Sequence, residues 1–189
     1  MWGIPVGLLY SNALEWAIHK YVLHGLGRDR RSFWSFHWHE HHRAARKGAM
    51  DDPGYRRPLW GLHAQGREAL SLVLASLVYV PLARRYPWFT ATVVGCQWYY
   101  WHVHRKSHLD PAWAREHLPW HVDHHLGPDQ DANWCVTFPW FDLLLGTRKP
   151  WVGTAAETAA RTAPPRPRRA PTAHGPTPPV PAVPPVPQP

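Results

Sequence analysis

The chain has 189 residues, a length typical of one domain with at most a short extension. It contains 15 histidines against 13 aspartates and glutamates together. Its two cysteines, Cys96 and Cys135, are too few for a disulfide-stapled secreted scaffold or a cysteine-rich zinc module. The net charge of +8 would suit nucleic acid, but 13 tryptophans and several apolar runs argue against such a partner. The histidine excess is therefore the feature to explain.

The first predicted element is an apolar helix over residues 2–18, and because no basic segment precedes it, a cleaved signal peptide is not expected. The first pair of histidines, His19 and His24, follows at once. On an ideal helix residues five apart are turned by about 140°. The two imidazoles can share a face only if the helix ends or unwinds near Leu23, where Gly25 follows.

The second histidine group lies in the segment FHWHEHH. His37 and His41 are i, i+4 neighbours on a predicted helix, and His42 points to an adjacent face. One helical turn can therefore serve two metal ions. His39 is a further candidate in the same segment.

Two apolar segments, residues 69–83 and 88–101, are separated by a turn that contains Arg84 and Arg85. They predict a helix, a basic turn and a second helix. Each arm is shorter than the ~20 residues that a perpendicular membrane span needs, but the flanking residues can extend both. The aromatic run at 98–101 resembles an interfacial belt. We expect a membrane hairpin, and a buried hairpin of a soluble helical protein is the alternative.

The third and fourth histidine groups follow this hairpin. The segment WHVHRKSH places His104 and His108 four residues apart on one helical face, with His102 as a less certain candidate. The segment HVDHH contributes three more candidates, His121, His124 and His125. Because a membrane hairpin returns to the side from which it started, the histidines before and after it are expected on the same face.

Together the four groups hold ten well-spaced imidazoles. Two octahedral metal ions offer about twelve coordination positions, so ten nitrogens leave about two for water or dioxygen. One zinc ion would need only three or four ligands. The count favours a dinuclear centre with open positions, and iron, zinc and copper all suit imidazole ligands. The alternative is a set of solvated surface histidines.

This series of histidine groups, His-x4-His, His-x3-His-His, His-x3-His and His-x2-His-His, resembles the fatty acid hydroxylase / sterol desaturase superfamily of integral-membrane diiron oxygenases. The segment 133–151, with its Asn-Trp, Trp-Phe-Asp and Gly-Thr, is similar to the ending of that family. The resemblance covers residues 14–151. The second group of the family often has two residues between its first histidines rather than three, so we take His37 as the ligand and keep His39 as the alternative.

The resemblance implies an all-α, integral-membrane helical bundle with a histidine-lined dimetal site on the cytoplasmic side. The implied catalytic domain is 1–152. No catalytic residue is implied beyond the metal ligands, which are His19, His24, His37, His41, His42, His104, His108, His121, His124 and His125.

The implied activity is hydroxylation or desaturation of a C–H bond of a lipid, such as a fatty acyl chain or a sterol. The implied cofactors are two iron ions, with zinc as a possible occupant, and dioxygen is the co-substrate. Electrons must come from a separate ferredoxin or a small cytochrome with its reductase, because the chain has no cysteine quartet and no nucleotide-binding glycine motif. A carotenoid hydroxylase and a non-catalytic membrane metal-binding protein are the alternatives.

The expected location is the bacterial inner membrane or the endoplasmic reticulum, with the histidine clusters facing the cytoplasm. Three acidic residues close to the histidines, Glu15, Glu40 and Asp123, are candidates to orient imidazole N–H groups, although salt bridges with nearby arginines are an equal alternative. Residues 153–189 are rich in proline, alanine and arginine and predict a disordered tail.

Overall fold

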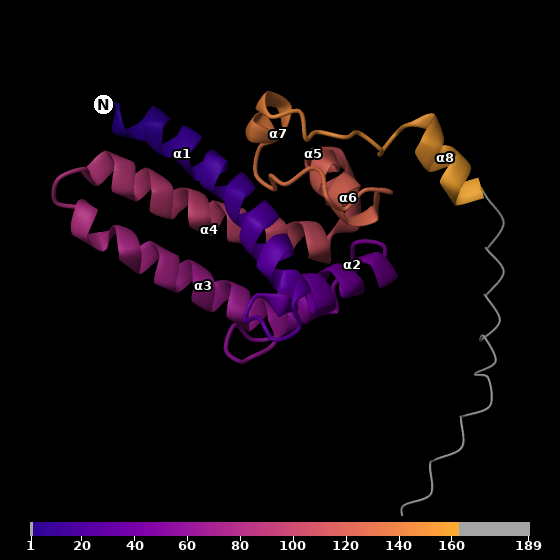
Figure 1. Cartoon of the computed structure of the whole chain (residues 1–189), viewed down its shortest axis with the longest axis horizontal. Coiled ribbons are helices and arrows are strands. Elements are labelled where there is room, and N and C mark those ends of the chain that lie inside the picture. The colour runs from indigo at the N-terminus through magenta and orange to yellow at the C-terminus, as the bar shows by residue number, and fades with distance from the viewer. Residues whose placement is uncertain (1, 163–189) are drawn as a thin grey trace, which may run out of the picture.

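The structure is a computed structural model, and it describes residues 2–162. Within that range every regular element is a helix and no strand is present, which confirms the all-α prediction. The molecule is elongated, with three long helices on one side and short helical elements gathered at the other end (Figure 1).

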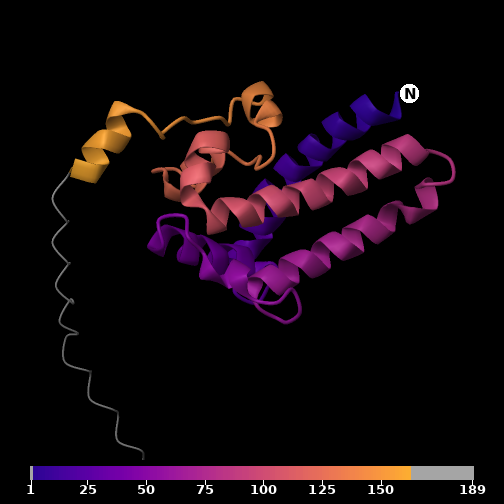
Figure 2. The ribbon, with the colours of Figure 1, turned by 180° about the vertical axis from the view of Figure 1, so that it is seen from behind.

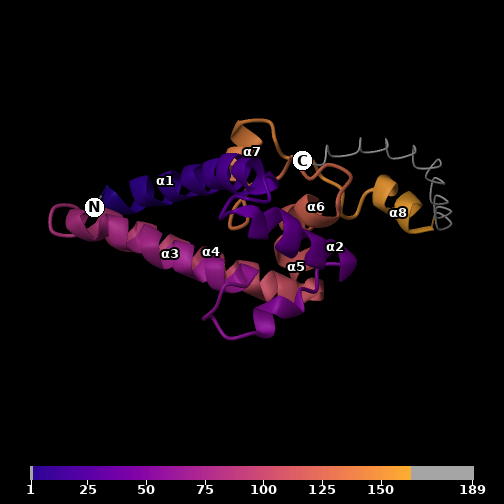
Figure 3. The ribbon, with the colours of Figure 1, turned by 60° about the horizontal axis from the view of Figure 1, so that its bottom comes forward.

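The long helices are α1 (Gly3–Ala17), α3 (Ala64–Tyr79) and α4 (Pro87–Leu109). Helices α3 and α4 form the predicted hairpin, and α1 packs against α4 (Figures 1 and 3). The start of α1 and the α3–α4 turn lie at the same end of the molecule in all views (Figure 2). Within residues 2–162, no helix combines the length and the apolar character that crossing a membrane requires.

The short elements form the opposite end of the molecule. They are η1 (Ile18–Gly25), η2 (Leu26–Arg28), η3 (His37–His42), α2 (Arg43–Lys47), η4 (Pro53–Arg56), α5 (Pro111–His117), α6 (Pro119–Leu126) and α7 (Trp140–Leu144). Helix α4 runs from the hairpin end of the molecule to the histidine end. Its last two turns carry the third histidine group. A short 3-10 turn, η5 (Val80–Leu82), ends α3.

The segment after residue 152 departs from the prediction of disorder. Residues Ala155–Thr162 form helix α8. Glu157 is buried there and pairs with Arg115 at 2.8 Å and with Arg161 at 3.0 Å. This part of the segment is rich in alanine and precedes the dense prolines, so nothing in it opposes a helix. The prediction was therefore wrong for 155–162, and residues 163–189 lie outside the described residues.

Apolar packing in the histidine end is divided into small clusters. One joins Trp16 of α1 to Trp134 and Cys135. Two others are built around Val122 and Val103. The interior between them is polar, because the candidate histidines of all four groups are buried. Buried polar groups are stable only when they are paired, so the fold of this end depends on what the histidines bind.

The contact between α1 and α4 requires glycine at two positions of α1. A Cβ atom at Gly7 would lie 2.9 Å from the Thr92 side chain, and one at Gly3 would lie 2.8 Å from the Phe89 nitrogen. Gly95 of α4 faces open space, since a Cβ atom added there would meet nothing within 4 Å. The two helices therefore approach more closely than side chains on α1 would permit.

We expect Gly7→Ala and Gly95→Ala to have opposite effects on thermal stability. Alanine favours a helix over glycine by up to about 1 kcal/mol, so Gly95→Ala should raise the unfolding midpoint. Gly7→Ala should lower it, because separating packed helices to relieve such a contact costs about 1–3 kcal/mol. Equal rises in the two midpoints would contradict the close packing of α1 on α4.

Candidate metal centre

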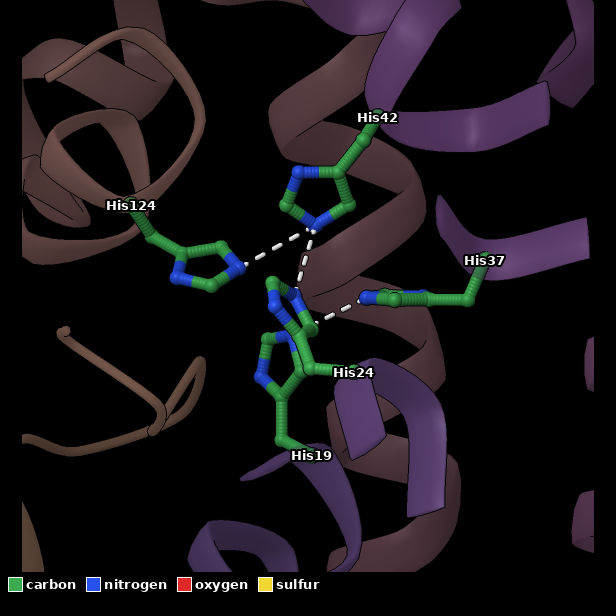
Figure 4. Close-up of side chains that lie close together, drawn as sticks. All are labelled: His19, His24, His37, His42 and His124. Carbon is green, nitrogen blue, oxygen red and sulfur yellow. Dashed lines mark hydrogen bonds between the residues drawn. The ribbon is translucent and has the colours of Figure 1, made fainter. Parts of the chain in front are cut away.

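Nine of the ten predicted histidines lie in two buried clusters whose ring nitrogens are within 4.8 Å of one another in each cluster. The first cluster contains His19, His24, His37, His42 and His124. The second cluster contains His41, His104, His108 and His125. In the first cluster the five rings converge on a common centre from η1, η3 and α6 (Figure 4).

The tenth histidine, His121, lies beside the second cluster. Its Nε2 atom is 3.1 Å from Nε2 of His108, and its ring centroid is 4.6 Å from that of His125. It is fully buried. All ten predicted residues are thus brought together, five around each centre.

Local helix geometry explains how His19 and His24 share a face. The segment Ile18–Gly25 is a π-helix, in which hydrogen bonds join residues five apart. The wider turn reduces the offset between residues five apart, so both imidazoles can reach the same cluster. The spacing predicts that the helix ends or unwinds near Leu23. In the structure the helix does not end there; the whole segment Ile18–Gly25 is wound more widely.

The second histidine group repeats this solution. His37–His42 is also a π-helix, so His37 and His42, five apart, both enter the first cluster. His41 turns to the second cluster. One turn therefore serves both clusters, as predicted, but the i, i+4 pairing of His37 with His41 was wrong because an α-helical period does not apply here.

Helices α4 and α6 supply the other side of the two clusters. His104 and His108 are i, i+4 neighbours on α4 and both face the second cluster, as their spacing predicted. The adjacent pair His124 and His125 on α6 divides between the clusters. Two adjacent pairs, one on η3 and one on α6, thus join the two centres.

The alternative candidates lie outside both clusters. The ring of His39 is hydrogen-bonded to the backbone carbonyl of Arg28 at 3.0 Å. His102 is exposed on α4. His63 caps the start of α3, where its ring accepts from the Gly66 N–H.

The hydrogen bonds of the Nδ1 atoms determine which nitrogens are free. Nδ1 of His19 lies 2.5 Å from the Trp134 carbonyl, and Nδ1 of His124 lies 2.7 Å from the Ala132 carbonyl. A carbonyl only accepts, so each Nδ1 carries the proton and each Nε2 carries a lone pair. Nε2 of His124 is nevertheless 3.1 Å from Nε2 of His42, whose own Nδ1 faces the Gln130 side-chain oxygen.

Ring nitrogens whose lone pairs face each other at this distance are compatible with a cation bound between them. Neutral imidazoles cannot hydrogen-bond to each other through two unprotonated nitrogens. Metal–imidazole bonds of about 2.1 Å at right angles would place two ligand nitrogens about 3.0 Å apart. In the first cluster, Nε2 of His19 and His37 are 3.0 Å apart and those of His24 and His42 are 3.1 Å apart. The residues present therefore fit a metal ion.

The second cluster also fits a metal ion, because several of its ring nitrogens are buried without a partner. Nε2 of His41, His104 and His125 is buried and has no hydrogen-bond partner among the described residues. Burying an unpaired imidazole nitrogen costs about 1–3 kcal/mol. A metal ion at this centre would satisfy all three atoms at once.

Burial keeps nine of the cluster imidazoles neutral, the form that binds metal, by lowering their pKa values. It lowers the pKa of His124 to about 4 and that of His24 to about 2. Desolvation also lowers the pKa of His41 and, together with neighbouring imidazoles, that of His19, His37, His42, His108, His121 and His125.

The acidic residues expected to orient the imidazoles have other partners. Glu40 forms an ion pair with Arg67. Asp123 pairs with Arg148 at 2.7 Å, and Glu15 accepts from the backbone N–H of Val136 at 2.6 Å. The alternative of a salt bridge with an arginine is therefore confirmed for Glu40 and Asp123, and the orienting role was wrong. Proximity in sequence does not place a carboxylate against the Nδ1 side of a ring.

The carboxylates that do contact the histidines gave no signal in the sequence. Asp52 lies 3.1 Å from Nδ1 of His41, and Glu68 lies 2.6 Å from Nδ1 of His104. Both are outside the histidine groups, in the loop before η4 and in the first turns of α3. No local spacing reveals them, since each reaches its imidazole only through tertiary packing.

The segment that contains Asn-Trp and Trp-Phe-Asp contacts the first cluster through backbone carbonyl groups. The buried carboxylate of Asp142 accepts from the N–H groups of Trp134 and Cys135, each at 2.8 Å. This fixes the stretch whose carbonyls receive His19 and His124. The segment therefore orients two imidazoles without contributing a ligand.

A cavity of about 320 Å³ extends between α1, α3 and α4 and reaches the first cluster. Its walls are mainly apolar, with Leu72, Val93 and Phe138 among them. His19 and His37 line its inner end. This volume is at the lower end of the range for small-molecule sites.

Comparisons with known proteins found no family model, curated protein or solved structure that matches the chain. The geometry itself defines the class of site. Two adjacent, buried histidine clusters are able to hold metal ions. An apolar cavity opens on one of them.

Purified protein is expected to contain about two metal ions per chain. His24→Ala in the first cluster and His108→Ala in the second should each lower the content to about one, because every ligand lost costs affinity at its own centre. Elemental analysis measures the content. His102→Ala, an exposed position on the same helix as His108, should retain two, and a loss as large as that of His108→Ala would reject the assignment.

Acid should destabilise the metal-free protein. The pKa of His124 is about 4 in the fold and 6.5 in its absence, so between these values only the unfolded chain takes the proton. Stability is full above about pH 6.5 and falls by about 1.4 kcal/mol per pH unit for each such histidine until its folded pKa is reached.

Denaturant unfolding of chelator-treated protein between about pH 7 and pH 5 measures this slope, in the range where an ordinary histidine titrates. His102→Ala, which leaves all the buried imidazoles in place, is the control and should show the same slope as the wild-type protein. A free energy of unfolding that is independent of pH would contradict the burial of neutral imidazoles.

Proposed function

We propose that the chain is a dimetal oxygenase of the fatty acid hydroxylase / sterol desaturase superfamily, which hydroxylates or desaturates a C–H bond of a lipid such as a fatty acyl chain or a sterol. The observation that carries the proposal is the apolar cavity that ends on His19 and His37 of the first cluster. A metal-storage site needs no such cavity. A lipid oxygenase needs both a metal centre and an apolar cavity that leads to it.

Ten imidazoles would hold two iron ions, five around each centre. An octahedral ion with five nitrogen ligands keeps about one position for dioxygen or water. When bound, the iron pair would supply the chemistry that reduces dioxygen and removes hydrogen from an unactivated carbon. Zinc suits the same nitrogens as an inactive occupant.

The chain itself would position the substrate and exclude water. Apolar side chains in the cavity wall, such as Leu72 and Val93, would pack against an alkyl chain and offer water no hydrogen bond. Farther from the histidines, the Ser76 hydroxyl donates to the Gln97 side chain at 2.8 Å, so this polar pair satisfies itself across α3 and α4. Held in this way, an alkyl chain would present one carbon to the first cluster.

Attachment to a membrane is supported by apolar side chains exposed on the long helices. Trp2 is 83% exposed, Val78 is 71% exposed and Trp88 is 62% exposed, all near the end of the molecule away from the histidines. Others on the same helices are Val6, Leu9, Val73, Leu74 and Leu77. Patches of this kind mark membrane or protein contacts. We place this end in the bacterial inner membrane or the endoplasmic reticulum, with the histidine end in the cytoplasm.

Electrons would come from a separate ferredoxin or a small cytochrome with its reductase. The chain has only two cysteines, half the number that a four-thiolate iron–sulfur cluster needs, and both are free thiols. No residue set for a flavin or nicotinamide is evident in the sequence. The oxygenase therefore depends on a redox partner.

The decisive experiment combines lipid profiling with dioxygen uptake. Cells that express the protein should accumulate one lipid class that has gained one oxygen or lost two hydrogens. Iron-loaded protein supplied with lipid, ferredoxin, its reductase and NADPH as the source of the two electrons should consume dioxygen, and omission of NADPH should stop the uptake. His24→Ala should abolish both signals, and exposed His102→Ala should leave both intact.

A cavity variant separates the lipid assignment from the metal assignment. Ala75→Trp places a large side chain in the cavity wall, away from the histidines. It should retain about two metal ions per chain but lose at least about tenfold in lipid oxidation, as expected when a substrate is misplaced near a reactive centre. Unchanged oxidation by Ala75→Trp would contradict the cavity as the substrate site.

A further inference from the structure

The two histidine clusters differ in what lies behind them. In the second cluster, Nδ1 of His41 faces the Asp52 carboxylate at 3.1 Å and Nδ1 of His104 faces the Glu68 carboxylate at 2.6 Å. Asp52 is buried, and the Glu68 side chain is 11% exposed. Two imidazoles of this cluster therefore donate to carboxylates that water screens poorly.

The first cluster has neutral partners in the same positions. Nδ1 of His19 and of His124 donate to backbone carbonyls, and Nδ1 of His42 faces the Gln130 side-chain oxygen at 3.0 Å. The nearest carboxylate, Asp131, is 3.6 Å from Nδ1 of His24. It is half exposed and is already paired with the Arg28 guanidinium at 2.6 Å, so its charge is largely balanced.

The two carboxylates of the second cluster are fixed by further hydrogen bonds. Asp52 accepts from the Gly54 N–H at 2.9 Å and from the Gln65 amide at 3.1 Å. Glu68 accepts from the Tyr55 hydroxyl at 2.7 Å. These contacts are all made within the chain, so each carboxylate is positioned by groups other than the histidine it faces.

A carboxylate behind a metal-bound imidazole makes that imidazole a stronger ligand, and losing such a partner typically costs about 10–100-fold in metal affinity. We propose that Asp52 and Glu68 make the second cluster the tighter metal site, which fills before the first. Asp52 and Glu68 are positioning residues that act through His41 and His104. This inference rests on the metal-binding part of the proposed function and not on oxygen chemistry.

The test is a titration of metal-stripped protein with Co²⁺ in the absence of dioxygen and lipid, followed by the visible absorption of the ion. The wild-type protein should bind two ions in two steps. Glu68→Gln and Asp52→Asn should each weaken the tight step by about tenfold or more and leave the second step unchanged. A single step with equal affinities, or equal weakening of both steps, would overturn the proposal.

The adjacent histidines of α6 provide a matched pair that assigns the steps to the clusters. His125→Ala removes a ligand of the second cluster and should abolish the tight step, whereas His124→Ala should abolish only the weak one. The reverse result would place the tight site in the first cluster and refute the inference. Gln130→Leu, behind His42, should affect the weak step alone.

Two further measurements distinguish a loss of Co²⁺ binding from a failure to fold and from a failure to oxidise lipid. Helical circular dichroism of each metal-stripped variant shows whether it is folded, and Tyr55→Phe, which keeps both carboxylates, is a milder variant that should weaken the tight step less than Glu68→Gln does. If both Co²⁺ steps appear as expected but lipid is never oxidised, the oxygenase proposal fails and the order of filling stands. If wild-type protein binds no Co²⁺, the order of filling is refuted together with the metal centre.

Discussion

The structure depends on ten imidazoles that are buried with their unprotonated nitrogens facing one another. In the first cluster these nitrogens are 3.0–3.1 Å apart. Without a cation, lone pairs at this distance repel and the buried atoms lack partners. With a cation between them, the facing Nε2 atoms gain a common partner. The polar interior of this end of the molecule is therefore suited to holding metal ions and would be unfavourable without a cation.

This requirement explains the unusual backbone. An α-helix brings residues three or four apart together, and residues five apart diverge by about 140°. His19 with His24, and His37 with His42, are five apart, and both pairs lie on π-helices. π-Helical turns are rare and occur often at functional sites. Their occurrence twice, at the two pairs with this spacing, ties the helix distortion to ligand placement.

Much of the site could be predicted from the sequence because histidine spacing along a helix is local information. The four groups, their ten candidates and the choice of His37 over His39 agree with the positions in the structure. The pairing within the second group failed because it assumed an α-helical period. Asp52 and Glu68 were missed because contacts between a loop, a hairpin helix and the histidines arise only on folding.

The long helices give the two centres different surroundings. The cavity between α1, α3 and α4 is lined by His19 and His37 of the first cluster, and no histidine of the second cluster is in its wall. Glu68 and Tyr100 both lie in the cavity wall and contact His104, so they connect the apolar space with the second centre. A substrate chain would therefore meet the centre whose partners are neutral, while the carboxylate-backed centre stays behind it. This division follows from two features of the fold: His19 and His37 line the cavity, and Asp52 and Glu68 lie behind His41 and His104.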